Sequence, residues 1–269
     1  MGSSRHSSDW ALILGASSGF GGATALELAK NGFHIFGVHL DRKATLPNAE
    51  KIIEKIKSYD SQAIFFNMNA ADAHKRVEAL NRMQEILRNS GEHSQIRVFM
   101  HSLAFGTLKP LIPEHASERP TVAQMDMTLD VMANSLVYWT QDIIFADLMK
   151  KNGRIFAMTS SGGHRVWPSY GLVSAAKAAI ESHVRQLALE LAPRGITVNA
   201  IQAGVTDTPA LRKIPGHEEM VAIARQRNPM GRLTTPEDVA KVIASLAHVN
   251  NDWMTGNVIR VDGGEDIVG

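Results

Sequence analysis

Tyr170 is the side chain in this sequence best suited to give a proton to a substrate oxygen. The other tyrosines have a simpler explanation in packing, because Tyr59 ends a surface-type helix and Tyr138 lies beside Trp139 in an amphipathic one. Lys177 follows Tyr170 by seven residues, almost two helical turns, which would place both on one helix face. A nearby cation lowers the pKa of a tyrosine and makes it a better proton donor. The pair therefore indicates reduction of a carbonyl or enone, in which an oxygen must be protonated as negative charge develops on it.

A glycine-rich segment follows the first apolar run of the chain. It reads GASSGFG over residues 15–21, and a helical pattern begins at its end. Glycine permits a tight turn and a close approach of the backbone to a pyrophosphate, whose charge is favourable at a helix N-terminus. A plain strand-to-helix turn is the alternative, which three glycines in this context make less convincing. We therefore expect a dinucleotide to bind here.

The composition argues against several classes of function. The chain of 269 residues has 44% apolar and 20% charged residues, as expected of a globular domain with its own core. Its formal net charge of +1 gives no electrostatic footprint for nucleic acid or an anionic membrane. Without cysteine there is no disulfide or thiolate catalysis, and the eleven histidines show no metal-ligand spacing, so we expect no metal site. No apolar run approaches the roughly 20 residues that span a bilayer, and a cytoplasmic location is expected.

Short apolar runs alternate with longer amphipathic segments from one end of the chain to the other. Strands separated by helices predict a parallel sheet with right-handed crossovers, and continuous apolar strands predict a sheet that is covered on both faces. We therefore expect a single Rossmann-type doubly wound α/β domain over residues 10–269, with about seven strands and helices on both faces of the sheet. A flexible tail is expected at residues 1–9.

The expected elements follow this alternation. The strands are expected at 10–14, 33–38, 63–68, 96–100, 153–158, 196–201 and 257–261. The helices are expected at 21–31, 49–59, 72–89, 124–150 and 169–191. Two long irregular stretches, near 105–121 and 203–235, follow the carboxyl ends of strands and are expected to be substrate loops.

Several segments resemble the short-chain dehydrogenase/reductase family. The spacing Gly-x-x-x-Gly-x-Gly is typical of that family, although Leu14 stands where a threonine is usual. The resemblance continues with Asn134, Ser160, Asn199 after ITV, AGVTDT over 203–208 and VDGG over 261–264, with Ala203 in place of the usual proline. It implies an NAD(P)H-dependent oxidoreductase with a Rossmann fold. It also implies a homotetramer, because members of the family are usually tetrameric.

The tyrosine spacing distinguishes branches within this family. Most members carry Tyr-x-x-x-Lys, but the residue four before Lys177 is Val173, which cannot donate a proton. Tyr-x6-Lys resembles the enoyl-acyl-carrier-protein reductases, and so does His101-Ser102-Leu103 where the family commonly has Asn-Asn-Ala. The best-known of these reductases have a second tyrosine where this chain has a serine. Their NADPH-dependent Bacillus-type branch carries serine in this region, and the resemblance is closest to that branch.

The resemblance implies hydride transfer to a trans-2-enoyl thioester of acyl-carrier-protein or coenzyme A, in fatty acid synthesis. Tyr170 would stabilise the enolate oxygen and donate the proton, while Lys177 would bind the nicotinamide ribose. The implied catalytic residues are Tyr170, Lys177, Ser160 and Asn134. The implied dinucleotide contacts are Gly15, Ser17, Ser18, Gly19, Phe20, Gly21, His39, Arg42, Asn69, Ser102, Leu103, Ala104, Lys177, Ala203, Gly204, Val205, Thr206 and Thr208. The candidates for the acyl pocket, with core packing as the alternative, are Phe105, Trp167, Val173, Leu211 and Ile214.

The end of the second strand helps to select the dinucleotide in this family. A carboxylate there holds the ribose hydroxyls and repels a 2′-phosphate, and His39 lies where NAD-preferring members usually carry that acid. Arg42 and Lys43 could pair with a phosphate, whereas Asp41 could bind the ribose of NADH. His39 and Arg42 favour NADPH, which we expect, with NADH as the alternative.

Other functions stay open on the sequence. Ser160 and Asn134 fit a 3-oxoacyl or other carbonyl reductase of the same family, which Val173 and the tyrosine spacing oppose. A reductase of a different enone or ketone would differ only in its pocket residues. A dinucleotide-binding regulatory protein without turnover is a further alternative, but such a protein need not keep Tyr170 and Lys177.

Overall fold

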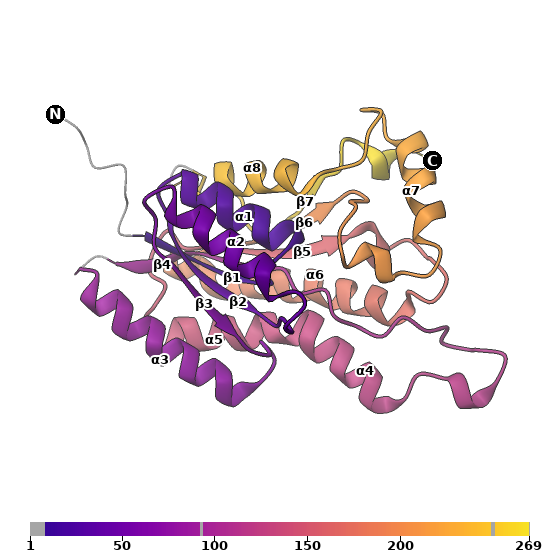
Figure 1. Cartoon of the computed structure of the whole chain (residues 1–269), viewed down its shortest axis with the longest axis horizontal. Helices are drawn as coiled ribbons and strands as arrows, with labels where there is room; N and C mark the ends of the chain where they lie inside the picture. Colours follow the sequence, from indigo (N-terminus) through magenta and orange to yellow (C-terminus); the bar gives the residue numbers. More distant parts are fainter. Residues whose placement is uncertain (1–8, 92–93, 249–250, 269) are drawn as a thin grey trace.

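Parallel strands form one sheet in the order β3-β2-β1-β4-β5-β6-β7 (Figure 1). The computed structural model describes residues 9–91, 94–248 and 251–268; Asp9, expected in the tail, is the first residue of β1, and the rest of the tail lies outside the described residues. The strands are β1 (Asp9–Leu14), β2 (His34–His39), β3 (Ala63–Asn67), β4 (Gln95–His101), β5 (Arg154–Ser160), β6 (Thr197–Ala203) and β7 (Val258–Val261). The strand order reverses between β1 and β4. Ligands of such sheets bind beyond the carboxyl ends of the strands at this switch point.

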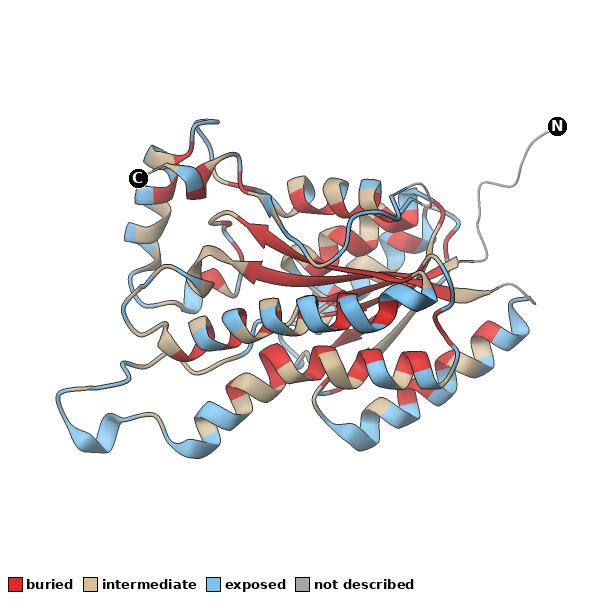
Figure 2. Ribbon diagram, turned by 180° about the vertical axis from the view of Figure 1, so that it is seen from behind, coloured by how far each residue is buried: buried red, intermediate tan, exposed pale blue. Residues whose placement is uncertain are grey.

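Helices cover both faces of this sheet and confirm the predicted doubly wound α/β fold. On one face lie α1 (Gly19–Lys30), α2 (Leu46–Lys57) and α8 (Pro236–Leu246). On the other face lie α3 (Ala73–Asn89), α4 (Val122–Leu129), α5 (Ser135–Phe145) and α6 (Gly171–Leu191). Figure 2 shows the central strands buried along most of their length, which explains why they are continuous apolar runs. Across the described ranges, no helix is both long and apolar enough to cross a membrane.

The helix expected over 124–150 is divided in the structure. α4 gives way to a π-helical turn (Asp130–Asn134), and α5 ends at Phe145. The chain then turns back at Asp147, which has a φ of +53°. The expected end of the helix at residue 150 is wrong, because the buried Leu148 continues the apolar pattern but is not helical. Its carbonyl oxygen instead accepts the N–H of Ile96 in β4 over 2.8 Å.

Part of the stretch expected to be irregular after β6 is helical. Within 203–235 the chain forms α7 (His217–Arg227), in which Ala224 is the buried residue. With so little apolar surface to bury, α7 has no periodic pattern that could predict it. α8 then begins after Thr235, whose side chain accepts the Asp238 N–H while the Asp238 carboxylate accepts the Thr235 N–H.

Candidate active site

The glycine turn after β1 leaves its backbone open at the start of α1. Gly15 and Gly19 have φ values of +86° and +53°. A Cβ on Gly15 would overlap the carbonyl oxygen of Ser102, and one on Gly21 would overlap that of Gly15. α1 has Ser18 as its N-cap, with no side-chain cap and no acidic residue in its first turn. The N–H groups at this end can therefore bind a phosphate, and the turn fits the pyrophosphate of a dinucleotide.

The loop after β6, residues 203–208, packs against this turn. A Cβ on Gly19 would meet the Thr208 methyl at 3.6 Å, so Thr208 borders the turn. The Val205 N–H is donated to the Glu265 carboxylate over 3.1 Å, so one of the Val205 backbone groups that were expected to hold a carboxamide already has a partner. The other predicted contacts in the loop, all buried or half-buried, are Ala203, Gly204 and Thr206. We call the turn 15–21 and this loop together the dinucleotide cradle.

Just beyond β2, Asp41 is half-buried, whereas its neighbour Arg42 is exposed. The Asp41 carboxylate is 2.8 Å from Nδ1 of the buried His39, and the Asp41 N–H donates to Asn67 Oδ1 over 3.0 Å. Burial alone would raise the pKa of Asp41, but hydrogen bonds with Thr45, Ser17 and His39 lower it below its usual value. An ionised carboxylate at this place can accept the hydroxyls of a ribose.

The remaining predicted dinucleotide contacts follow β1, β3 and β4. The Ser102 N–H donates to the Leu14 carbonyl oxygen over 3.0 Å, which holds the end of β4 beside β1. Asn69 is exposed after β3, and its Oδ1 accepts the Ala71 N–H over 3.0 Å. The others at this edge, partly or fully exposed, are Phe20, Leu103 and Ala104.

Ser160, Tyr170 and Lys177 meet where β5 ends and α6 begins. The Tyr170 hydroxyl lies 3.5 Å from Ser160 Oγ. The Lys177 ammonium donates to the Met158 carbonyl oxygen over 2.8 Å. Tyr170 immediately precedes α6, after Ser169 at a φ of +63°, so the tyrosine and the lysine do not share a helix face as expected. Instead, two residues at the end of β5 contact the two side chains, Met158 that of Lys177 and Ser160 that of Tyr170.

Burial determines the protonation of these groups. It lowers the pKa of Lys177 to about 8, and the charge of Glu181 opposes this change. It raises the pKa of Tyr170 above its usual value, which the hydrogen bond with Ser160 opposes. His101, at the end of β4, has its pKa lowered to about 3 by burial and by the charge of Lys177, and is therefore neutral. Near neutral pH, the site holds a protonated tyrosine and a buried lysine, and burial raises the tyrosine pKa where the sequence led us to expect a nearby cation to lower it.

Thr159 and Glu181 lie beside Ser160 and Lys177, although the sequence did not mark either of them as a site residue. Glu181 follows Lys177 by four residues on α6, and its carboxylate accepts the Thr159 hydroxyl over 2.7 Å. Thr159 stands between the two β5 residues that hold Lys177 and Tyr170. The Lys-x3-Glu spacing could have indicated Glu181, but nothing in the sequence pairs it with Thr159. We call Thr159, Ser160, Tyr170, Lys177 and Glu181 the catalytic wall.

Asn134 is not brought to the catalytic wall. It ends the π-helical turn, and its Oδ1 is 3.2 Å from Nε2 of His183. It lines an open hollow of about 780 Å³ together with Asn69 and Asp72. Its part in catalysis stays a prediction.

The candidates for the acyl pocket differ in their burial and in their neighbours. Val173 is buried, and a Cβ on Gly106 would meet its methyl group at 3.1 Å. The Trp167 indole N–H donates to the Pro215 carbonyl oxygen over 2.9 Å, so Trp167 contacts the segment that follows the dinucleotide cradle. Phe105 is 57% exposed at the start of the other loop. The two that remain, respectively buried and half-buried, are Leu211 and Ile214.

Comparison with known families identifies the chain. The family described as Enoyl-(Acyl carrier protein) reductase matches residues 15–265, which include the dinucleotide cradle and the catalytic wall. The chain belongs to the short-chain dehydrogenase/reductase family. It is accordingly an NAD(P)-dependent oxidoreductase.

The relatives of this chain within the family are named after different substrates. The 1-cyclohexenylcarbonyl-CoA reductase of Streptomyces collinus is 31% identical, over 96% of this chain and 86% of its own. The cyclohexanol dehydrogenase of a Rhodococcus species is 29% identical, over 94% of each chain. A solved short-chain dehydrogenase from Burkholderia cenocepacia in complex with NADP is 25% identical, with a TM-score of 0.83 over 97% of this chain and 99% of that chain. The comparisons give the family and the fold, whereas the substrate depends on the site.

Proposed function

We propose that this short-chain reductase acts on the carbon–carbon double bond of a trans-2-enoyl thioester. The observation that carries the proposal is the position of the proton donor. The residue four positions before Lys177 is Val173, which is buried against Gly106. Its side chain has no proton to donate. The tyrosine lies seven residues before Lys177, with its hydroxyl at the end of β5. The family description and the coenzyme A thioester reductase from Streptomyces support the same assignment.

The dinucleotide, when bound, supplies the hydride that adds to the β-carbon of the enoyl group. The N–H groups of the glycine turn would hold its pyrophosphate, and Lys177 would bind its ribose. Tyr170 donates a hydrogen bond to the thioester oxygen, where the electron pair of the double bond collects as enolate charge, and then gives its proton to that oxygen. The enol becomes the saturated thioester when a proton moves from the oxygen to the α-carbon. Ser160 orients the Tyr170 hydroxyl, and the charge of Lys177 stabilises the resulting tyrosinate. A hydrogen bond to a developing oxyanion typically supplies about 3 kcal/mol of the reduction in barrier.

A second candidate is a 3-oxoacyl or other carbonyl reductase. The distance of 3.5 Å between Ser160 Oγ and the Tyr170 hydroxyl favours it, because two hydroxyls so placed can hold one ketone oxygen between them. The relative from Rhodococcus, named for an alcohol, supports this candidate.

For the dinucleotide, we propose NADH in place of the NADPH expected from His39 and Arg42. The Asp41 carboxylate lies 2.8 Å from His39 just beyond β2, and its lowered pKa keeps it ionised, so its charge would repel a 2′-phosphate and its oxygens could accept ribose hydroxyls. Arg42, on which NADPH depended, is exposed. The Burkholderia relative contains NADP, so family membership alone does not decide the choice.

Two proposals concern partners of the chain. The thioester would be carried by acyl-carrier-protein or coenzyme A, and the chain would assemble as a homotetramer. Phe145 of α5 is 82% exposed and Leu189 of α6 is 70% exposed, and assembly through these helices would cover both.

The test uses purified protein with NADH or NADPH and a pair of matched substrates. Crotonyl and acetoacetyl thioesters differ at the group to be reduced, and loss of the absorbance of the reduced nicotinamide reports turnover. We expect turnover of the crotonyl thioester, with butyryl thioester as the product. Turnover of the acetoacetyl thioester alone would replace the first proposal by the second, and turnover of neither would overturn both.

A further inference from the structure

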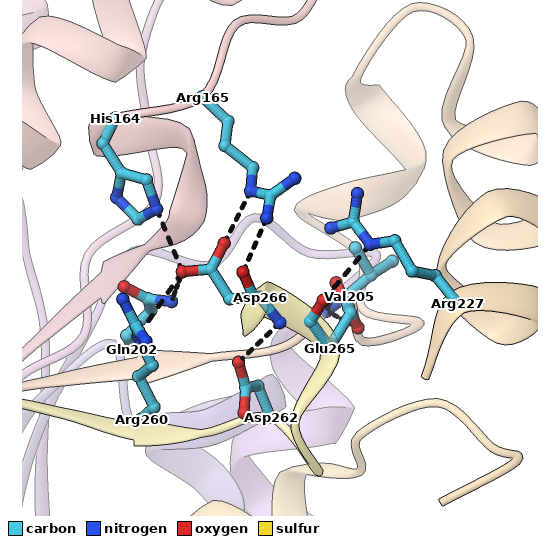
Figure 3. A network of polar contacts seen from close by, with 9 residues as sticks. All are labelled: His164, Arg165, Gln202, Val205, Arg227, Arg260, Asp262, Glu265 and Asp266. Atoms are coloured by element: carbon cyan, nitrogen blue, oxygen red, sulfur yellow. Dashed lines mark hydrogen bonds and ion pairs between the residues drawn. The ribbon is translucent and has the colours of Figure 1, made fainter. Parts of the chain in front are cut away.

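Adjacent carboxylates at the end of the chain lie between two segments that the proposed function uses (Figure 3). Glu265 and Asp266 belong to a 3-10 turn after β7 (Glu265–Ile267) and are 3% and 8% exposed. Asp262 shapes this turn, because its carboxylate accepts the N–H groups of Gly264 and Asp266 over 2.9 and 3.1 Å. Buried neighbouring carboxylates are unfavourable unless each has partners, so their partners indicate why the fold retains them.

The Glu265 carboxylate is hydrogen-bonded to the dinucleotide cradle. Its carboxylate oxygens accept the Val205 N–H over 3.1 and 3.3 Å. A Cβ on Gly204 would come within 2.9 Å of one of these oxygens, so the loop passes directly over the carboxylate. The Glu265 carbonyl oxygen accepts Nε of Arg227, the last residue of α7, over 3.2 Å. The cradle and α7 are thus attached to the same turn.

Asp266 is bonded to two residues of the segment between Ser160 and Tyr170. Arg165 donates from Nε to the Asp266 carboxylate and from Nη2 to its carbonyl oxygen, each over 2.6 Å. Nε2 of His164 lies 3.0 Å from the same carboxylate, and the buried Gln202 of β6 donates to it over 3.0 Å. Burial opposes ionisation, but hydrogen bonds from Gln202 and Arg165 and the charge of His164 lower the pKa of Asp266. The carboxylate is therefore charged at neutral pH.

We propose that Glu265 and Asp266 are positioning residues that fix the dinucleotide cradle relative to the Tyr170 segment. The proposal rests on the proposed function, since it assigns the two segments to dinucleotide and substrate. Figure 3 shows the two carboxylates directed to opposite sides of the turn, toward Val205 and toward Arg165. A shift of about 1 Å between reacting groups can cost roughly 100-fold in rate, so such a link matters for hydride and proton transfer.

The two carboxylates predict separable losses. Glu265→Ala frees the Val205 N–H, and we expect dinucleotide affinity to fall about tenfold with a smaller change in kcat. Glu265→Gln keeps an oxygen that can accept this N–H and should restore most of the affinity. Asp266→Asn keeps the shape but loses the ion pair with Arg165, and we expect kcat to fall by roughly tenfold with the affinity kept. Glu190→Gln, an exposed change on α6, is the matched control.

The experiment combines titration of NADH fluorescence, kcat for the crotonyl thioester, and hydrogen exchange read by mass spectrometry. Exchange should increase in 203–208 for Glu265→Ala and in 161–170 for Asp266→Asn, and in neither segment for Glu190→Gln. If Glu265→Ala does not fold, Glu265→Met, which has a similar volume but cannot accept the Val205 N–H, replaces it, and Arg165→Ala repeats the comparison on the Asp266 side. Unchanged exchange in both segments, or equal losses of affinity and kcat in every variant, would overturn the proposal. Absence of turnover in the wild type would instead contradict the proposed function. The titration of NADH and the hydrogen exchange would then still test the positioning proposal.

Discussion

The dinucleotide cradle is formed mainly by backbone groups, whereas the catalytic wall is formed by side chains. The cradle depends on backbone, because Gly15 and Gly21 have no room for a Cβ and the N–H groups of α1 are left open. The wall depends on side chains, because consecutive residues of β5 bind Lys177, Glu181 and Tyr170. A backbone site accepts the phosphates common to all dinucleotides, whereas a side-chain site decides which bond is reduced. The relatives of this chain have names with different substrates, which fits a substrate choice made by side chains.

Gly21→Ala is expected to have the largest effect, because it breaks the backbone site. The new Cβ would overlap the Gly15 carbonyl oxygen, so the turn must open. We expect a loss of about 1–3 kcal/mol in the free energy of unfolding, as for overpacking, together with loss of dinucleotide binding. Thermal unfolding and NADH fluorescence measure the two. Gly22→Ala is the control, since its Cβ would first meet the flexible end of Ile52 at 2.8 Å, and equal effects would refute the backbone account.

Lys177→Ala should be the next largest, because Lys177 serves both regions. Removing the buried cation takes away the ribose contact and the charge that stabilises a tyrosinate. We expect kcat to fall by about 10²–10⁴ and the dinucleotide Kd to rise, measured on one preparation. Lys241→Ala, an exposed change on α8, should alter neither. Wild-type turnover in Lys177→Ala would remove the lysine from the site.

The pH dependence sharpens the comparison on the side-chain site. Burial lowers the pKa of Lys177 to about 8, so its charge is present below that pH and lost as the pH rises through it. Turnover and dinucleotide affinity should fall together over this range, while Tyr170, whose pKa is raised, stays protonated. Glu181→Gln removes the charge that favours the ammonium, and the midpoint should move down by roughly one pH unit. A midpoint that does not move, with Glu190→Gln as control, would show that Glu181 does not act on Lys177.

Asp41→Asn should have the smallest effect on rate, since it changes only which dinucleotide is preferred. Without the carboxylate charge, affinity for NADPH should increase by roughly tenfold relative to NADH. Competitive titration of the two dinucleotides gives the ratio. Arg42→Ala should leave the ratio unchanged. A selective loss of NADPH in that variant would restore the phosphate role expected from the sequence.

The sheet and the glycine turn could be predicted because both leave local patterns in the sequence. Continuous apolar strands follow from a sheet buried on both faces, and glycine spacing follows from the crowding at Gly15 and Gly21. The position of Tyr170 could not be predicted, since a positive φ at Ser169 delays the start of α6 to Gly171 and leaves the tyrosine before the helix. The partners of Glu265 and Asp266 lie far away in the sequence and leave no spacing to detect.

The most direct test of the account is Tyr170→Phe, compared with the wild type in kcat and in dinucleotide Kd. The phenylalanine keeps the ring that packs against Gly162 but has no hydroxyl to donate a proton. The account predicts a fall in kcat of about 10²–10⁴ with an unchanged Kd, because the dinucleotide is held by backbone and Lys177. A kcat close to that of the wild type would contradict it, since some other group would then be protonating the substrate.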